Sequence, residues 1–172
     1  MSQFLLNVIF VIYVIAGVGL VAYGFNCYAS IYLFLKNSRR VRLTDRKNIL
    51  KFYREHSLDE LPVVTTQLPV FNEANCVERL IEAVCAMDYP KDKHEIQVLD
   101  DSTDECYEVT KRKVAEMQAC GYDIKLIHRT IRKDYKAGAL KEGMVVARGN
   151  FLAIFDADFV PEKDFLLKTI PY

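Results

Sequence analysis

The sequence predicts an α/β fold, with a mainly parallel sheet that carries helices on both faces and is preceded by one transmembrane helix. Three observations lead to this prediction. An uncharged apolar run occupies the N-terminal part, strand-like and helix-like segments alternate after Pro62, and each strand-like segment stops at polar or acidic residues. Such alternation is typical of parallel sheets, whose ligands bind beyond the carboxyl ends of the strands.

The N-terminal segment is long and apolar enough to cross a bilayer. No charged residue occurs from Phe4 to Leu35, about 32 positions, whereas a helix needs about 20 to cross the hydrocarbon core. A cleaved signal peptide would have a basic start and a shorter apolar core, and the start "MSQ" has no basic side chain. We therefore predict a transmembrane anchor over residues 1–36.

A basic segment follows the anchor. Between Lys36 and Arg54 there are eight lysines and arginines and one acid, Asp45. We interpret residues 37–60 as a basic juxtamembrane linker or helix. Because basic flanks favour the cytoplasmic side, we predict an N-terminus outside and a cytoplasmic main domain. Such a flank can also rest on anionic headgroups.

The overall composition argues against two kinds of site. The formal net charge is zero, which gives no reason to expect a nucleic-acid partner. The five cysteines are scattered and none forms a CxxC pair, so a zinc site is not expected. Reduced thiols in a cytosolic domain fit this pattern.

Residues 61–172 read as four strands, each followed by a helix. In the first helix, apolar residues recur at helical spacing from Val77 to Met87. Gly121 closes the second helix and Pro161 opens the fourth. In chain order the predicted strands are "LPVVTTQLPV", "HEIQVLDD", "YDIKLIHR" and "NFLAIFDAD", and the helices are "EANCVERLIEAVCAM", "DECYEVTKRKVAEMQACG", "KAGALKEGMVVARG" and "PEKDFLLKTI".

The first strand ends in "QLPVFNEAN". Pro69 stops strand pairing because proline has no N–H to donate. Two interpretations stay open for the polar residues that follow: Asn72 or Asn75 caps the next helix, with Glu73 favouring its dipole, or these side chains contact a ligand. Phe71 is expected to stack on a base or to fill a gap.

The second strand ends in "VLDDSTDE". Ser102 or Thr103 is expected to cap the next helix. Capping needs only one such group, so Asp100 and Asp101 indicate a polar ligand, for example ribose hydroxyls.

The third strand ends in a basic loop that contains Arg129, Arg132, Lys133 and Lys136. Basic side chains beside a helix N-terminus suit an anion such as phosphate. A solvated charged loop is the alternative.

The fourth strand ends in "FDADF". Residues i and i+2 of an extended segment point to one face, so Asp156 and Asp158 are expected to project together. Two neighbouring carboxylates repel unless a proton or cation joins them. A hard divalent cation bound by one or two carboxylates and by phosphate oxygens meets this need. The strand end therefore predicts a metal that holds a diphosphate.

Four segments, "QLPVFNE", "VLDDSTD", "DYKAGALKEG" and "FDADF", together resemble the inverting, membrane-bound family 2 glycosyltransferases of the GT-A fold. The resemblance covers about residues 61–172 and is greatest to the cellulose-synthase-like branch that makes β-linked glucan, mannan or glucomannan backbones. Many cellulose and hyaluronan synthases have Asn at the position of Ala139.

The resemblance implies roles for the strand-end residues. Asp100 and Asp101 match the carboxylates near the base and ribose, Lys136 matches the lysine of the KAG motif, and Asp156 and Asp158 match the metal-binding DxD. It also implies Mg²⁺ or Mn²⁺, a nucleotide-sugar donor such as UDP-glucose or GDP-mannose, and a glycan acceptor. We place Pro69, Phe71, Asn72 and Glu73 in the same substrate site.

One departure limits what this chain is expected to do alone. In that family an acidic general base and a Gln-x-x-Arg-Trp motif lie downstream of the DxD, and this chain has no tryptophan and ends at Tyr172. We therefore expect residues 61–172 to be the donor-binding part of a longer enzyme, nearly inactive by itself, since a general base contributes about 10²–10⁴-fold. The alternative is a membrane-tethered nucleotide-sugar-binding module without catalysis.

Overall fold

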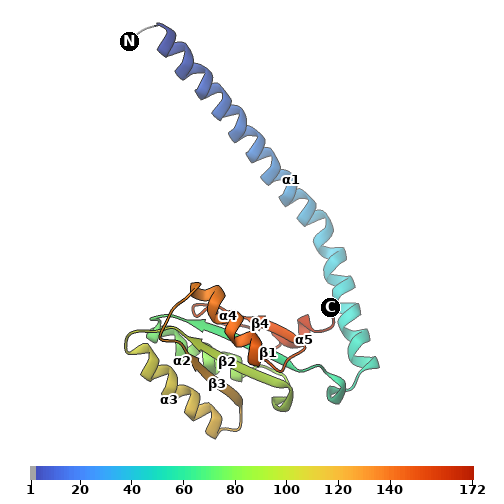
Figure 1. Cartoon of the computed structure of the whole chain (residues 1–172). Coiled ribbons are helices and arrows are strands. Elements are labelled where there is room, and N and C mark those ends of the chain that lie inside the picture. The colour runs from blue at the N-terminus through green and yellow to red at the C-terminus, as the bar shows by residue number, and fades with distance from the viewer. Residues whose placement is uncertain (1–2) are drawn as a thin grey trace. The chain divides into compact units, whose positions relative to one another are not determined.

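The structure, a computed structural model, describes residues 3–172, and the chain divides after Lys51 into two compact units. Helix α1 (Gln3–Glu55) runs without interruption through the predicted end of the anchor, and only its last turn belongs to the second unit (Figure 1). Its segment Gln3–Ser38, with a mean hydropathy of 2.7, is a candidate membrane span by length and composition. The predicted N-terminal helix is therefore confirmed.

The second unit is built on a four-stranded sheet in the order β3-β2-β1-β4. All three neighbouring pairs are parallel, as the sequence predicts. The strands are β1 (Val64–Val70), β2 (His94–Asp100), β3 (Asp123–His128) and β4 (Phe151–Ile154). The central strands β1 and β2 are paired in register from Val64↔His94 to Val70↔Asp100.

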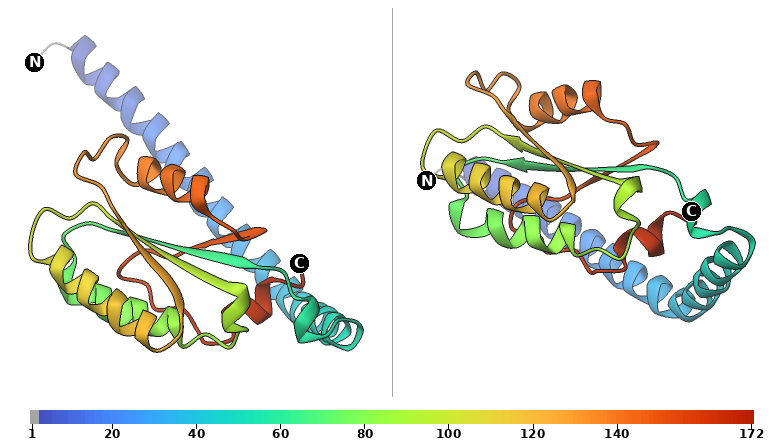
Figure 2. Two further views of the ribbon diagram at one scale, coloured as in Figure 1. Left: turned by 60° about the horizontal axis from the view of Figure 1, so that its bottom comes forward. Right: turned by 90° about the horizontal axis from the view of Figure 1, so that it is seen from below.

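Helices cover both faces of this sheet, which confirms the predicted α/β class. Figure 2 shows α2 and α3 on one face and α4 on the other. The helices are α2 (Ala74–Cys85), α3 (Cys106–Ala119), α4 (Tyr135–Val146) and the short α5 (Phe165–Thr169), and the 3-10 turns are η1 (Leu58–Glu60) and η2 (Lys91–Lys93).

The apolar core lies between the sheet and the α2–α3 layer. Val77, Leu80 and Ile81 of α2 are fully buried and belong to one cluster with Leu68 and Ile96 of the sheet. The helical spacing of these residues in the sequence therefore corresponds to a buried face. Burial of such a side chain contributes about 1.5–3 kcal/mol, so this layer holds the sheet in place.

The face toward α4 is polar and tightly packed. The Gln67 side chain donates to Gln97 Oε1 at 3.0 Å and to the Leu140 carbonyl of α4 at 3.4 Å. A Cβ added at Gly143 of α4 would lie 2.5 Å from Gln67 Nε2 and 2.8 Å from Gln97 Oε1. Glycine therefore lets α4 approach a pair of amide side chains that fills this side of the sheet.

A buried acid closes the amino end of the sheet. Glu95 is fully buried, and it accepts hydrogen bonds from the Thr65 hydroxyl (2.6 Å), the Arg148 backbone N–H (2.7 Å) and Lys125 Nζ (2.9 Å). Burial by itself raises the pKa of Glu95, but these hydrogen bonds outweigh it and lower the pKa to about 2. The carboxylate therefore stays charged and ties β1, β2, β3 and the loop before β4 together.

The end of the predicted fourth strand and the start of the last helix differ from the structure. β4 ends at Ile154, because the next position of β1 that faces β4 is Pro69, which has no N–H to offer. Asp156 and Asp158 therefore lie beyond the strand, in a turn closed by a 3.0 Å bond from Phe159 N–H to the Asp156 carbonyl. The last helix begins at Phe165 and not at Pro161.

Gly143→Ala is expected to destabilise the second unit by about 1–3 kcal/mol, since the added methyl overpacks the amide pair of Gln67 and Gln97. Chemical denaturation of the detergent-solubilised chain measures this change. The exposed Lys141→Ala on the same helix is the control and should change the unfolding free energy by less than about 0.5 kcal/mol. Equal unfolding midpoints for both variants would contradict the close approach.

Burial lowers the pKa of His94 to about 4 from its usual 6.5, and its Nε2 lies 2.8 Å from the Thr66 hydroxyl. Between about pH 6.5 and 4, His94 therefore binds a proton in the unfolded chain but not in the folded chain. The free energy of unfolding falls as the pH falls through this window. From pH 7 to pH 5 the parent should lose about 2 kcal/mol more than His94→Gln. Chemical denaturation of the parent and of His94→Gln at both pH values measures these losses. Equal losses of unfolding free energy in the two proteins would count against the prediction.

Candidate functional site

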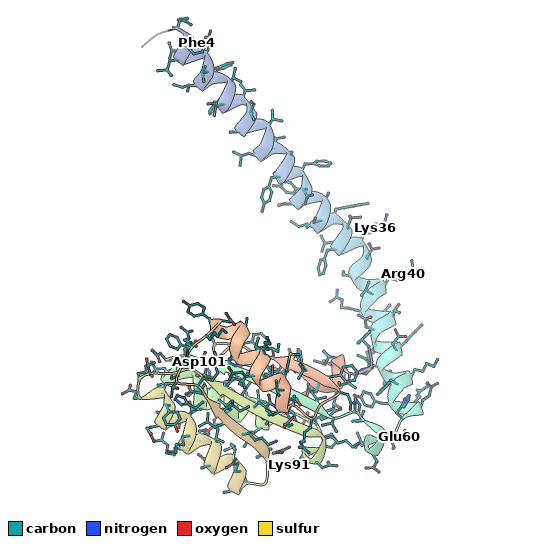
Figure 3. All side chains as sticks on the ribbon, viewed as in Figure 1. Phe4, Lys36, Arg40, Glu60, Lys91 and Asp101 are labelled. Atoms are coloured by element: carbon teal, nitrogen blue, oxygen red, sulfur yellow. The ribbon has the colours of Figure 1, made fainter. Side chains whose placement is uncertain are left out.

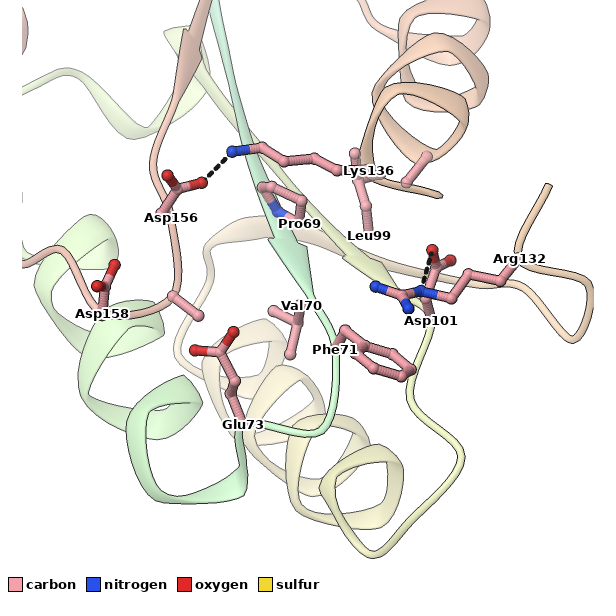
Figure 4. Close-up of a pocket in the computed structure, with 12 residues that line it drawn as sticks. Pro69, Val70, Phe71, Glu73, Leu99, Asp101, Arg132, Lys136, Asp156 and Asp158 are labelled. Atoms are coloured by element: carbon pink, nitrogen blue, oxygen red, sulfur yellow. Dashed lines mark hydrogen bonds and ion pairs between the residues drawn. The ribbon is translucent and has the colours of Figure 1, made fainter. Parts of the chain in front are cut away.

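A pocket of about 390 Å³ opens where the strands end (Figure 4). Its wall comes from the loop after β1, the end of β2, the loop between β3 and α4, the first turn of α4 and the turn after β4. The lining residues are Pro69, Val70, Phe71, Glu73, Leu99, Asp101, Arg132, Lys136, Ala139, Asp156, Ala157 and Asp158. Strand ends that are far apart in the sequence thus meet at one site, as expected for a parallel sheet.

A bidentate ion pair holds Asp101, one of the residues that line this site. Arg129 Nε donates to Asp101 Oδ1 at 2.7 Å, and Arg129 Nη2 donates to Asp101 Oδ2 at 2.6 Å. Both residues are buried. Hydrogen bonding to Asp101 raises the pKa of the Arg129 guanidinium, so the pair remains charged. The sequence placed Arg129 only in a general basic loop and missed this role.

Arg129 also fixes the loop that leads into α4. It donates to the carbonyls of Tyr135 at 2.9 Å and Lys133 at 3.2 Å. The loop includes two left-handed residues, Asp134 (φ 56°) and Tyr135 (φ 47°), a conformation that costs free energy in non-glycine residues. The buried guanidinium stabilises this turn and sets where the first residues of α4 lie.

Gly138 of the "KAG" segment is needed for this arrangement. A Cβ at this position would lie 2.1 Å from the Lys133 carbonyl oxygen and 2.8 Å from Arg129 Nη1. No side chain fits there unless the loop moves. Gly138 thus lets the first turn of α4 pack closely against Arg129, which holds the loop.

The two adjacent aspartates at the end of β2 have different surroundings. Asp101 lines the pocket, whereas the fully buried Asp100 places Oδ2 2.7 Å from His128 Nδ1. The His128 ring lies 4.3 Å from the Tyr107 ring. Asp100 Oδ1 has no hydrogen-bond partner among the residues that the structure describes. The structure therefore puts Asp101 in the pocket and Asp100 beside it, so the expected contact of Asp100 with a nucleoside stays a prediction.

An arginine covers the ring of Phe71. The Arg132 guanidinium lies 3.3 Å from the centroid of the Phe71 ring, within the range of a cation–π contact, and Arg132 Nε lies 3.6 Å from Asp101 Oδ2. Figure 4 shows Phe71, Arg132 and Asp101 next to one another at one side of the pocket. The aromatic ring and the charge that the sequence placed on separate loops are thus in direct contact.

Asn72 joins two loops and does not cap a helix. Its φ is 55°, its Oδ1 accepts from the Thr103 N–H at 2.9 Å, and its own N–H donates to Ser102 Oγ at 3.0 Å. The N-cap residue of α2 is Glu73, which makes no side-chain capping bond. Capping of α2 by Asn72 or Asn75, and of α3 by Ser102 or Thr103, was therefore wrong: Asp104 Oδ1 accepts the Cys106 N–H at 2.9 Å.

Charged side chains of both signs face each other across the pocket. Lys136, in the first turn of α4, forms an ion pair with Asp156, and both are exposed. Asp158 and Glu73 line the same pocket. The expectation that Asp156 and Asp158 share one face of an extended strand was wrong, since both lie in the turn after β4, yet both reach the pocket.

The model of the family "Glycosyl transferase family 2" matches residues 67–172. This is more than half of the chain, and it includes all the loops that line the pocket. The chain belongs to glycosyl transferase family 2. The resemblance drawn from the strand-end segments is therefore confirmed.

Relatives within this family include glucomannan 4-beta-mannosyltransferases. One from Arabidopsis thaliana is 41% identical over 143 residues, which are 77% of this chain and 27% of the relative. Another, from Oryza sativa subsp. japonica, is 48% identical over 115 residues, 64% of this chain and 22% of the relative. The chain thus spans about a fifth to a quarter of the length of these curated relatives.

Solved structures confirm the GT-A fold class. A mannosyltransferase from Pyrobaculum calidifontis, solved with GDP-Man and Mn²⁺, has a TM-score of 0.60 at 27% identity, over 77% of this chain and 42% of that one. The S. aureus protein TarS has a TM-score of 0.53 at 21% identity, over 60% of this chain and 30% of that one. The second likeness concerns the fold alone.

Arg129→Lys is expected to lower the free energy of unfolding by about 3 kcal/mol or more, because lysine cannot replace the bidentate pair and leaves Asp101 buried with one partner lost. Denaturant titration of the detergent-solubilised chain measures the change. The control is Arg112→Lys, since Arg112 makes an exposed ion pair with Glu78, which contributes about 0–1 kcal/mol. A loss for Arg129→Lys no larger than for the control would show that the pair is not structural.

Proposed function

We propose that the pocket binds the nucleotide diphosphate of a sugar donor, and that this family 2 domain transfers the sugar to a hydroxyl of a β-linked polysaccharide. The observation that carries the proposal is the convergence of Lys136, Arg132, Asp156 and Asp158 on one pocket at the carboxyl ends of the strands. The names of the relatives favour mannose as the transferred sugar and glucomannan as the acceptor, and the mannosyltransferase solved with GDP-Man favours GDP-mannose over UDP-glucose as the donor.

The chemistry of the reaction explains the cations in the pocket. Transfer breaks the bond between the anomeric carbon and a phosphate oxygen. The acceptor hydroxyl oxygen forms the new bond and gives its proton to a general base, while negative charge develops on the departing diphosphate. Fixed cations near that charge stabilise the transition state. Lys136 is placed by the first turn of α4, and Arg132 by its contact with Phe71.

The acidic side chains of the pocket fit a divalent cation. Asp156 and Asp158 present exposed carboxylates to one pocket, and Mg²⁺ is commonly held by one or two carboxylates together with substrate phosphates. Among residues 3–172, no cluster of three or more histidine, cysteine or acidic residues is close enough to hold a metal alone. Asp156 and Asp158 would therefore hold Mg²⁺ or Mn²⁺ jointly with the donor, where the ion offsets diphosphate charge.

Metal binding at Asp156 would also change how Lys136 meets the donor. Without a cation, Asp156 is paired with Lys136. A metal ion at Asp156 would replace that partner, which would free Lys136 to face a phosphate oxygen. Exchange of ion-pair partners would thus couple metal binding to donor binding.

We further propose that Gln3–Ser38 crosses a membrane with the N-terminus outside and the family 2 domain in the cytoplasm. The span is long and apolar enough, and Lys36 to Arg54 carry the basic excess that favours the cytoplasmic side.

Calorimetric titration of the detergent-solubilised chain with GDP-mannose, with and without Mn²⁺, tests the donor site. We expect Mn²⁺ to strengthen binding about tenfold or more, and the double variant Asp156→Asn, Asp158→Asn to lose this gain because its amides coordinate the ion more weakly. The control is Asp88→Asn, Asp92→Asn, which removes two exposed acids outside the pocket and should keep the gain.

Two outcomes would go against the proposal. If Mn²⁺ changes the affinity equally for both double variants, Asp156 and Asp158 do not hold the metal. Transfer is tested separately, by incorporation of labelled mannose from GDP-mannose into polysaccharide in membranes that carry a full-length protein containing this chain, since the chain alone is expected to be nearly inactive. Donor binding with no transfer there would favour a binding module.

A further inference from the structure

The basic residues that follow the candidate span are arranged on one side of α1. The helix is continuous from Gln3 to Glu55, so each residue is turned by about 100° from the one before it. On this geometry five basic residues fall within a sector of about 60°. This basic stripe comprises Lys36, Arg40, Lys47, Lys51 and Arg54, all of them exposed.

The stripe, whose first residues Lys36 and Arg40 are labelled in Figure 3, is long and contains no acid, although Glu55 follows its last residue about 40° beyond its edge. At about 1.5 Å per residue, it extends about 27 Å along the helix axis from Lys36 to Arg54. Asp45, the one acid between its ends, lies about 150° away from the middle of the stripe. Like charges held in a row repel, so a surface of this kind gains free energy from an anionic partner.

The opposite side of the same helix is used for packing. Phe52 and Tyr53 are packed against the core of the second unit, and the Tyr53 hydroxyl donates to the Leu167 carbonyl at 2.9 Å. Both residues lie more than about 100° around the helix from the middle of the stripe. In the last turn of α1, Phe52 and Tyr53 therefore pack inward, whereas the exposed Arg54 belongs to the stripe.

We propose that the basic stripe lies on anionic phospholipid headgroups of the bilayer that α1 enters. The stripe begins inside the candidate span, which ends at Ser38, so its first charge is already at headgroup level. Attraction between basic side chains and anionic lipids fades within a Debye length, about 8 Å at physiological salt. An upright helix would carry Arg54 about 24 Å beyond Ser38. Contact along the whole stripe therefore requires α1 to bend just after the span, so that the part with the stripe lies along the surface.

This proposal rests on the membrane anchor of the proposed function and not on sugar transfer. Its consequence is that the lipid composition of the cytoplasmic leaflet sets how firmly the last turns of α1 are held. Each basic side chain at an anionic surface changes the association by about fivefold.

The test uses the full chain reconstituted in phosphatidylcholine bilayers, with spin-labelled phosphatidylserine or phosphatidylcholine as probes. Electron spin resonance gives the ratio of association of the two lipids with the protein. We expect a preference for phosphatidylserine that weakens with added salt. The stripe variant Arg40→Gln, Lys47→Gln should reduce the preference about fivefold or more.

The matched control is Arg42→Gln, Arg46→Gln. It removes the same charge at the same distance from the span, but both positions lie about 80–120° outside the edges of the stripe. We expect it to reduce the preference less than about twofold, because its charges lie farther from the lipid. The proposal would be overturned if both variants reduced the preference for phosphatidylserine equally, or if the parent showed no such preference. The stripe would then face solvent or an acidic protein. Absence of any immobilised lipid would overturn the anchor as well, whether or not the chain binds GDP-mannose.

Discussion

The buried ion pair between Asp101 and Arg129 is the contact on which the pocket depends. It joins the end of β2 to the first residue after β3, and the same guanidinium holds the carbonyls of Lys133 and Tyr135. A buried pair is costly to break on one side only, so the loop has little freedom. The positions of Arg132 and Lys136 follow from that constraint, because one lies inside the loop and the other immediately after it.

The order of the elements was predictable from the sequence because it rests on local periodicity. Val77, Leu80 and Ile81 recur at the helical period and are fully buried, and the parallel sheet follows from the alternation of strands and helices. Where β1, β2 and β3 end was predictable as well, since polar residues there must face solvent or a ligand.

What the sequence did not reveal depends on contacts between distant segments. Asn72 was interpreted as a local cap, but it bonds to residues about thirty positions away, in the loop after β2. The end of β4 is decided by a proline in another strand, so the local run of apolar residues suggested a longer strand than the four residues observed. Arg129 looked like one charge in a basic loop. Only the fold shows that Asp101 neutralises it.

Buried acids have different surroundings at the two ends of the sheet. At the amino end, Glu95 is surrounded by Thr65, Lys125 and Arg148, and its charge serves cohesion alone. At the carboxyl end, Asp101 is also buried and paired, with Arg129, but it borders an open pocket. Stability and ligand binding are thus separated along the strands, as is usual in parallel α/β folds.

Helix α4 is attached to the sheet by a glycine and a pair of amides, not by a broad apolar face, and Met144, Val145 and Val146 are more than half exposed. Such an element has a low free energy of local opening. The first turn of α4 carries Lys136 and is held by Arg129 through the Tyr135 carbonyl, whereas the later turns rest on the sheet through Gly143 and the amide pair. Opening of these later turns would leave the cationic side of the pocket in place, with the rest of the domain intact.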